Sequence, residues 1–108
     1  MAMVKRFEVY LVNLDEEITK DAKNTRPSVI VSPDEMNRHL RSVIIAPISA
    51  SEGKYPTRIP VKLLKNDRVI VLDQLQTVDK ERLVKKIGDI DSGASRKTID
   101  RLQELFAE

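Results

Sequence analysis

The most restrictive feature of this 108-residue sequence is a series of short apolar segments rich in valine and isoleucine. Each segment is too short to form a helix that buries a core, and β-branched residues favour strands. Turn-forming or charged residues separate the segments. The order therefore predicts a mainly β fold built from short strands at residues 7–14, 28–32, 42–49, 57–64, 69–72 and 84–90.

One segment has a helical period instead. Ile99, Leu102 and Phe106 are three and four positions apart, which predicts an amphipathic helix with one apolar face. We expect Ser92 or Ser95 to cap its first turn. A small barrel or rolled sheet whose open edge this C-terminal helix covers fits the pattern, so the predicted class is mainly β with about 5–7 short strands and added helices.

The sequence Ser-Pro-Asp-Glu at residues 32–35 predicts a second, shorter helix. Ser32 stands at the capping position, Pro33 at the first helical position and Glu35 at the third. We expect this helix to end near Asn37.

Prolines and turn residues make further predictions. Pro47 and Pro60 fall inside expected strands; Pro47 predicts an edge or a bulge and Pro60 predicts an edge, because proline has no backbone N–H. Asn66 and Asp67 predict a turn, and residues 79–83 a short helical turn. Residues 15–26 carry charges of both signs without a period, which predicts a long loop between the first two strands.

Composition limits the class of protein. The length suits one domain spanning residues 1–108, and 41% hydrophobic residues suffice for a core made mostly of valine, isoleucine and leucine. The absence of cysteine excludes disulfides, thiolate catalysis and cysteine-ligated metals. The net charge of +2 is too small by itself to indicate nucleic-acid binding. No apolar run approaches the roughly 20 residues of a membrane helix and no signal peptide is visible, so we expect a soluble cytoplasmic protein.

Four stretches in order carry a family resemblance: RFEVYLVNLD, RPSVIVSPDEMN, VIIAPIS and VIVLDQLQTVDKERLVKKIGDID. This series resembles the MazF/PemK/Kid family of toxin endoribonucleases over nearly the whole chain. The most specific parts are Arg26 with Pro27 and the D-Q-x-x-T-x-D-x-x-R-L pattern that begins at Asp73. The resemblance implies an SH3-like small β-barrel with added helices that forms a homodimer and cuts single-stranded RNA at short sequences without a metal or other cofactor. It also implies an antitoxin partner whose acidic, flexible tail blocks the RNA groove.

The resemblance assigns the catalytic candidates. Arg26 matches the family's catalytic arginine, and a guanidinium holds two phosphate oxygens while keeping its charge. As a base, Arg26 would have to lose a proton whose pKa is roughly six units above neutral, at a cost of about 8 kcal/mol. Ser49 matches a catalytic threonine or serine that donates to the phosphate or relays a proton. Asp21 falls where many members carry a glutamate, which acts as base or orients the arginine, and Asp73 matches an aspartate that some members use.

RNA contacts are expected from the two long loops and from the Asp-Gln pattern. Lysines and arginines would meet backbone phosphates, and a tyrosine would stack on a base for about 1–3 kcal/mol or cover the rim of the core. The candidate RNA-binding residues are Lys20, Lys23, Lys54, Tyr55, Arg58 and Gln74.

Two other features favour plain structural interpretations. His39, the single histidine, is expected to be a solvent-exposed loop residue rather than a general acid. The acidic run at residues 15–17 is expected to be solvated, so no metal site is predicted.

Two rival functions remain open. A protein-binding toxin of the same barrel type, such as the CcdB gyrase inhibitors, depends on a C-terminal tryptophan, whereas this chain has no tryptophan and ends in LFAE. A catalytically weakened member that only binds RNA is the other alternative.

Overall fold

The structure is a computed structural model that describes residues 3–18, 23–50 and 57–107. Within these residues the strands are β1 (Glu8–Asn13), β2 (Thr25–Ile30), β3 (Ser42–Ser49), β4 (Arg58–Leu63), β5 (Asn66–Val71), β6 (Gln76–Asp79) and β7 (Leu83–Asp89). The helices are α1 (Asp34–His39) and α2 (Ser92–Phe106), with short 3-10 turns at η1 (Leu72–Gln74) and η2 (Lys80–Arg82). Neither α-helix has the length and apolar character needed to cross a bilayer.

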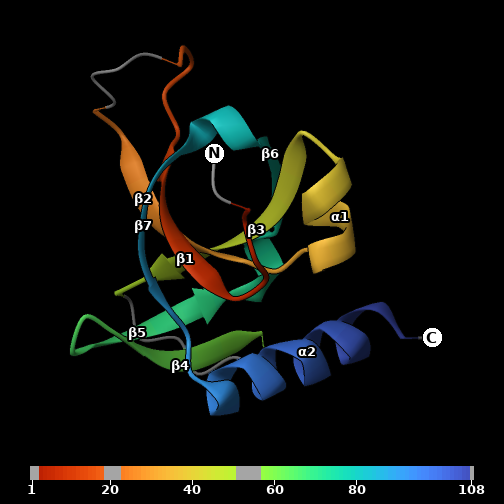
Figure 1. Cartoon of the computed structure of the whole chain (residues 1–108). Helices are drawn as coiled ribbons and strands as arrows, with labels where there is room; N and C mark the ends of the chain where they lie inside the picture. Colours follow the sequence, from red (N-terminus) through yellow and green to blue (C-terminus); the bar gives the residue numbers. More distant parts are fainter. Residues whose placement is uncertain (1–2, 19–22, 51–56, 108) are drawn as a thin grey trace.

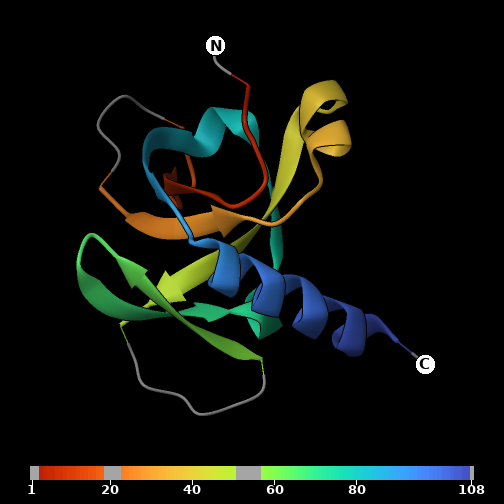
Figure 2. The ribbon, with the colours of Figure 1, turned by 60° about the horizontal axis from the view of Figure 1, so that its bottom comes forward.

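The strands form one antiparallel sheet in the order β4-β5-β3-β2-β1-β7, and β6 joins at β3. Along one side of β3, the first half pairs with β6 and the last two residues pair with β5. The sheet therefore bends at β3 into a half-barrel, with α2 beside β4 (Figures 1 and 2). The predicted mainly β class with short helices and a C-terminal helix is confirmed.

Both faces of the sheet are buried along its centre, which explains the continuous apolar runs in the sequence. The main core lies on one face and contains Val9, Val29, Val31, Ala46, Ile48, Ile59, Val61, Leu63, Ile70, Leu72, Ile90 and Ala94. The second core lies on the other face and contains Val4, Val12, Ile30, Val43, Ile45 and Val78. Neighbours such as Val29 and Ile30 thus belong to different cores, as strand alternation requires.

The C-terminal helix begins differently from the prediction. Asp91 is its N-cap, because the Asp91 carboxylate accepts a 2.8 Å hydrogen bond from the Ala94 N–H. Leu102 packs against the main core, but Phe106 is 72% exposed. The predicted apolar face is therefore wrong at Phe106, because the end of α2 runs past the sheet (Figure 2).

The short helix α1 is fixed by a buried polar network rather than by a serine cap. The Ser32 hydroxyl donates to Asn37 Oδ1 and accepts from the Ile44 N–H at 3.1 Å. Asn37 Nδ2 donates to Ser32 O at 2.9 Å, and Lys80 Nζ donates to Asn37 O. Pro33 occupies the cap position and makes no side-chain capping bond, so the predicted role of Ser32 is wrong.

Two strand boundaries also differ from the prediction. Strand β2 begins at Thr25, so Arg26 and Pro27 lie inside a strand and not in the preceding loop. Their backbone pairs with β1, where Val12 stands opposite Arg26. Strand β6 was not predicted, because its sequence QTVD has a single apolar residue and pairing with β3 stabilises it.

The two prolines inside strands differ in how well their positions match the prediction. Pro60 lies in the edge strand β4, as predicted. Pro47 lies in the central strand β3, so of its two predicted alternatives, an edge or a bulge, the edge is wrong. It is tolerated because β3 has left β6 after Ile45 and does not pair with β5 until Ile48.

The turn between β4 and β5 is centred at Leu64 and Lys65, not at the predicted Asn66 and Asp67. Leu64 and Lys65 have φ values of 50° and 68°. Positive φ at both central residues of a tight hairpin is the geometry that asparagine and glycine adopt most easily. We expect the Leu64→Asn/Lys65→Gly variant to raise the free energy of unfolding by about 1–2 kcal/mol, because it relieves this strain and removes an exposed leucine. Urea titration measures the change.

A matched control is Lys62→Gly, which places glycine at an exposed position inside β4 where no positive φ is needed. This control should lose stability, because glycine weakens a strand. A turn variant that loses stability to the same extent would contradict the strain argument.

An ion pair joins β1 to β7. Glu8 accepts hydrogen bonds from Lys5 N at 2.6 Å and from Lys86 Nζ at 2.7 Å. Burial raises the pKa of Glu8, but the hydrogen bonds from Lys86 and Lys5 outweigh it, so the pKa is lowered from its usual value. Glu8 therefore contributes stability above its unfolded pKa, and this contribution is lost as the pH falls through the lower folded pKa.

We expect Glu8→Gln to destabilise the protein at pH 7 by about 1–3 kcal/mol and to remove part of the stability loss below about pH 4. Urea unfolding at pH 7 and at pH 3 checks this. Glu104→Gln is the control, since Glu104 pairs with Arg101 on the exposed surface of α2. An unchanged slope of stability against pH in Glu8→Gln would contradict the assignment.

Candidate active site

The register of β2 and β3 brings Arg26 and Ser49 to the same part of the sheet. The two strands pair at Ser28 opposite Pro47, and Arg26 and Ser49 are each two residues from this last pair. Residues two apart on a strand point to the same face, and so do residues opposite each other. Arg26 and Ser49, both half-buried, therefore lie on one face, opposite the main core.

The ladder between β2 and β3 stops just before these residues. Beyond Ser28 and Pro47, Arg26 pairs with Val12 of β1, and Ser49 pairs with Val69 of β5. Each residue is thus anchored by the neighbouring strand on its far side. The first residues of β2 and the last two residues of β3 therefore lie outside the β2–β3 ladder, with the Arg26 and Ser49 side chains on the same face.

Arg58 lies on the same face as Ser49. In the β4–β5 ladder, Pro60 is opposite Val69, which is the partner of Ser49, and Arg58 is two residues from Pro60. Arg58 Nε is 3.3 Å from Asp73 Oδ1. A second cationic side chain therefore shares the surface that carries Arg26.

Asp73 is held as a carboxylate. Its Oδ1 also accepts a 3.0 Å hydrogen bond from the Thr57 hydroxyl. Slight desolvation raises the pKa of Asp73, but the Thr57 hydrogen bond, the residue's own N–H and the Arg58 charge lower the pKa below its usual value. At neutral pH Asp73 is therefore ionised and fixed against Arg58.

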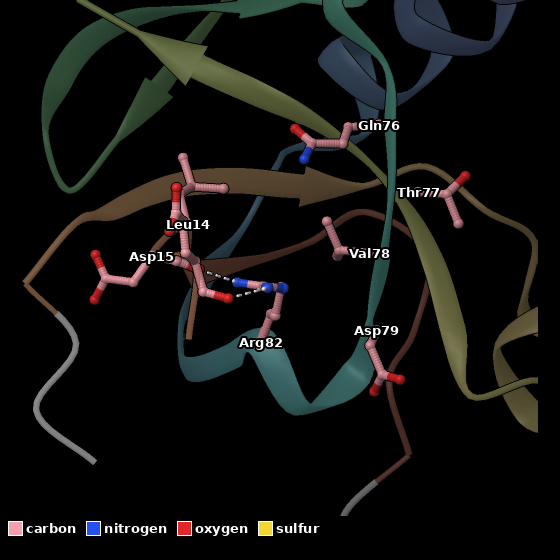
Figure 3. Close-up of a pocket in the computed structure, with 8 residues that line it drawn as sticks. Leu14, Asp15, Gln76, Thr77, Val78, Asp79 and Arg82 are labelled. Atoms are coloured by element: carbon pink, nitrogen blue, oxygen red, sulfur yellow. Dashed lines mark hydrogen bonds between the residues drawn. The ribbon is translucent and has the colours of Figure 1, made fainter. Parts of the chain in front are cut away.

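A pocket of about 300 Å³ opens between the end of β1 and strand β6 (Figure 3). Its lining is mostly polar and consists of Leu14, Asp15, Glu16, Gln76, Thr77, Val78, Asp79 and Arg82. Gln76 is opposite Ile45, which is opposite Ile30 of β2, so Gln76 lies on the sheet face that carries Arg26. The pocket therefore belongs to the same side of the molecule as the candidate site.

The remaining predicted residues are distributed as follows. Lys23 is exposed and its N–H donates to Asp15, and Gln74 is exposed in η1. The predicted site residues that lie outside the described part of the chain are Lys20, Asp21, Lys54 and Tyr55.

His39 is exposed, as predicted, but it is the last residue of α1 rather than a loop residue, with Nε2 3.4 Å from Glu35 Oε1. Among residues 3–18, 23–50 and 57–107, no group of three or more His, Asp or Glu side chains is placed to hold a metal ion.

Sequence reasoning did not single out Gln76, Thr77 or Arg82 as site residues, although they line the pocket. Thr77 and Arg82 stand in the D-Q-x-x-T-x-D-x-x-R-L pattern, which was the available signal. Their positions depend on β6, whose polar sequence gives no strand pattern.

Comparison with known proteins agrees with this architecture. The model of a family described as the PemK-like, MazF-like toxin of type II toxin-antitoxin system matches residues 5–106. The chain is 32% identical over 111 residues to Endoribonuclease EndoA of Bacillus subtilis (strain 168), covering 97% of this chain and 96% of the relative.

Solved structures share the fold. MazE-MazF (Form-II) from Deinococcus radiodurans has a TM-score of 0.82 at 15% identity and covers 99% of this chain and 98% of that one. An endoribonuclease in complex with its cognate antitoxin from mycobacterial species has a TM-score of 0.78 at 21% identity and covers 94% and 92%. With the family match across nearly all of its length, the chain belongs to the PemK-like, MazF-like toxins of type II toxin-antitoxin systems.

Proposed function

We propose that this chain is a toxin endoribonuclease that cleaves single-stranded RNA, including mRNA, at a specific short sequence in the cytoplasm and without a metal ion. One observation carries the proposal: Arg26 and Ser49 lie on one sheet face where the β2–β3 ladder ends. The 32% identity to an endoribonuclease over nearly the whole chain supports the assignment.

The proposed reaction uses the RNA's own 2'-OH as nucleophile. The 2'-oxygen forms a bond to phosphorus and the bond to the 5'-oxygen breaks, which leaves a 2',3'-cyclic phosphate and a 5'-OH. The 2'-OH loses its proton to a base, and the departing 5'-oxygen takes one up. Negative charge grows on the non-bridging oxygens, so a fixed cation beside them stabilises the transition state.

Arg26 is the proposed cation. Its guanidinium donates two parallel hydrogen bonds to the phosphate and needs no proton transfer to do so. Pairing of its backbone with β1 holds it in position. Ser49 donates to a phosphate oxygen or relays a proton.

Carboxylates supply the remaining roles in the proposal. Asp21 acts as the base or orients the Arg26 guanidinium. Asp73 was expected in catalysis, and its contacts with Arg58 and Thr57 favour a role in holding Arg58 toward the RNA.

RNA binding is proposed along this same sheet face. Arg58 meets backbone phosphate, and Gln74 contacts a base edge. Lys20, Lys23 and Lys54 add phosphate contacts, and Tyr55 stacks on a base.

The proposed partners are a second copy of this chain and an antitoxin with an acidic, flexible tail. The tail would compete with RNA for Arg26 and Arg58, because both ligands are anionic. This proposal is supported by the similar structure from mycobacterial species, which is described as an endoribonuclease in complex with its cognate antitoxin.

The test is incubation of the purified protein with a mixed single-stranded RNA in EDTA. We expect discrete fragments with cyclic-phosphate ends, and no cleavage of the same RNA annealed to its complement. Intact RNA together with inhibition of DNA gyrase would replace this proposal with the CcdB-like function. Intact RNA that is nevertheless bound would indicate a weakened member.

A further inference from the structure

We propose that Arg82 and Asp15 are positioning residues. They clamp the chain that leaves β1 (residues 14–16) to the chain that enters β2 (residues 23–24), and thereby hold Arg26 for catalysis. This inference rests on the proposed nuclease function. Neither residue is assigned to the reacting atoms, and both lie in the wall of the pocket in Figure 3.

Arg82 holds the chain where it leaves β1. Its Nη1 donates to Asn13 O at 3.1 Å and to Asp15 O at 2.6 Å, and Nη2 lies 3.4 Å from Glu16 O. The guanidinium therefore spans the backbone from the end of β1 into the following residues. Asp79 stabilises the η2 turn that carries Arg82, since the Asp79 carboxylate caps this turn by accepting from the Glu81 N–H at 3.0 Å.

Asp15 joins the chain that leaves β1 to the chain that enters β2. Its two carboxylate oxygens accept from Lys23 N at 3.0 Å and from Asn24 N at 3.1 Å. The backbone adds Leu14 N to Asn24 O at 2.8 Å. Asn13, 2% exposed, accepts from the Asp15 N–H at 2.8 Å, which sets the direction in which Asp15 leaves the strand.

The chain that enters β2 leads directly to Arg26. Asn24 precedes Thr25 and Arg26, and these first residues of β2 pair with β1 but not with β3. Arg26 therefore depends on the β1 side and on the chain just before it for its position. A continuous set of contacts runs from Arg82 through Asp15 to Asn24 and so to Arg26.

The chemistry of the two side chains fits positioning better than RNA contact. Arg82 forms no salt bridge within the described residues and directs its donors to backbone carbonyls. The Asp15 carboxylate accepts from backbone N–H groups. Charged groups bonded to backbone dipoles form stronger hydrogen bonds than neutral pairs, and a lysine cannot reproduce the planar fork that reaches several carbonyls.

The experiment compares Arg82→Lys and Asp15→Asn with wild type in single-turnover RNA cleavage. We expect the rate of the chemical step to fall about tenfold, on the scale of lost positioning, while RNA affinity changes less than about threefold. Arg101→Lys on α2 is the control, and it should cleave like wild type because Arg101 forms its ion pair with Glu104 on the exposed surface of its own helix.

Two further readouts separate positioning from a general loss of structure. Introduced into an Arg26→Ala background, Arg82→Lys should have no further effect on the rate, because it acts through Arg26. Amide exchange at Lys23 and Asn24 should speed up at least about tenfold in Asp15→Asn, with global stability retained.

The clamp proposal is overturned if the rate losses caused by Arg82→Lys and Arg26→Ala multiply in the double variant. It is also overturned if Arg82→Lys and Asp15→Asn lower only the affinity for RNA. If wild-type protein leaves RNA intact, the nuclease proposal fails. Protected amides at Lys23 and Asn24 that stay protected in Asp15→Asn would overturn the clamp independently of activity.

Discussion

Replacing Arg26 with alanine is expected to lower kcat/KM for single-stranded RNA by about 1,000-fold or more. The loss follows from the proposed role of the guanidinium, which is to stabilise charge that grows on the phosphate only in the transition state. Removing one preorganised donor from such a site costs about 100- to 1,000-fold, and cationic arginines at phosphoryl groups contribute about 1,000-fold or more. Single-turnover cleavage of a fluorescent oligonucleotide measures the change.

Arg26→Lys sharpens this prediction. A lysine restores the charge but not the parallel pair of hydrogen bonds, so we expect it to recover less than about tenfold of the lost rate. Arg101→Ala, which removes a cation from the exposed face of α2, is the matched control and should cleave normally. Equal activity of Arg26→Ala and wild type, with both folded, would remove Arg26 from the mechanism.

Ser49→Ala is expected to lower the rate of the chemical step by about 10- to 100-fold, the scale of one lost preorganised donor or relay. Ser49→Thr should retain most of the activity, because it keeps the hydroxyl at the end of β3. Alanine is close to serine in volume and threonine adds one methyl group, so a similar loss in both variants would point to packing rather than to the hydroxyl. Unchanged activity in Ser49→Ala would exclude the hydroxyl from the reaction.

Much of the fold was predictable because the strands carry a local signal. Segments such as residues 42–49 contain β-branched residues on both faces, and both faces are buried in the structure. The resemblance singled out Arg26 and Ser49, but no local pattern places them together. Their placement on one sheet face follows from the β2–β3 register, which is a long-range pairing between strands.

The features that were missed share a physical cause, since each depends on tertiary context. Strand β6 exists because β3 offers a partner for a polar segment. Pro47 is accepted in a central strand because β3 changes partners at that point. Leu64 and Lys65 adopt positive φ, which their residue types do not predict. The Arg82–Asp15 contacts likewise join segments 67 residues apart.

A single deoxy substitution in the substrate tests the central claim most directly. If the 2'-OH next to the scissile phosphate is the nucleophile, an oligonucleotide lacking only that hydroxyl remains uncut and still binds. The same oligonucleotide with one deoxy nucleotide elsewhere is cut as usual. Cleavage of the first substrate at the same bond would show that water or a protein group attacks the phosphorus, and the proposed chemistry at Arg26 and Ser49 would be wrong.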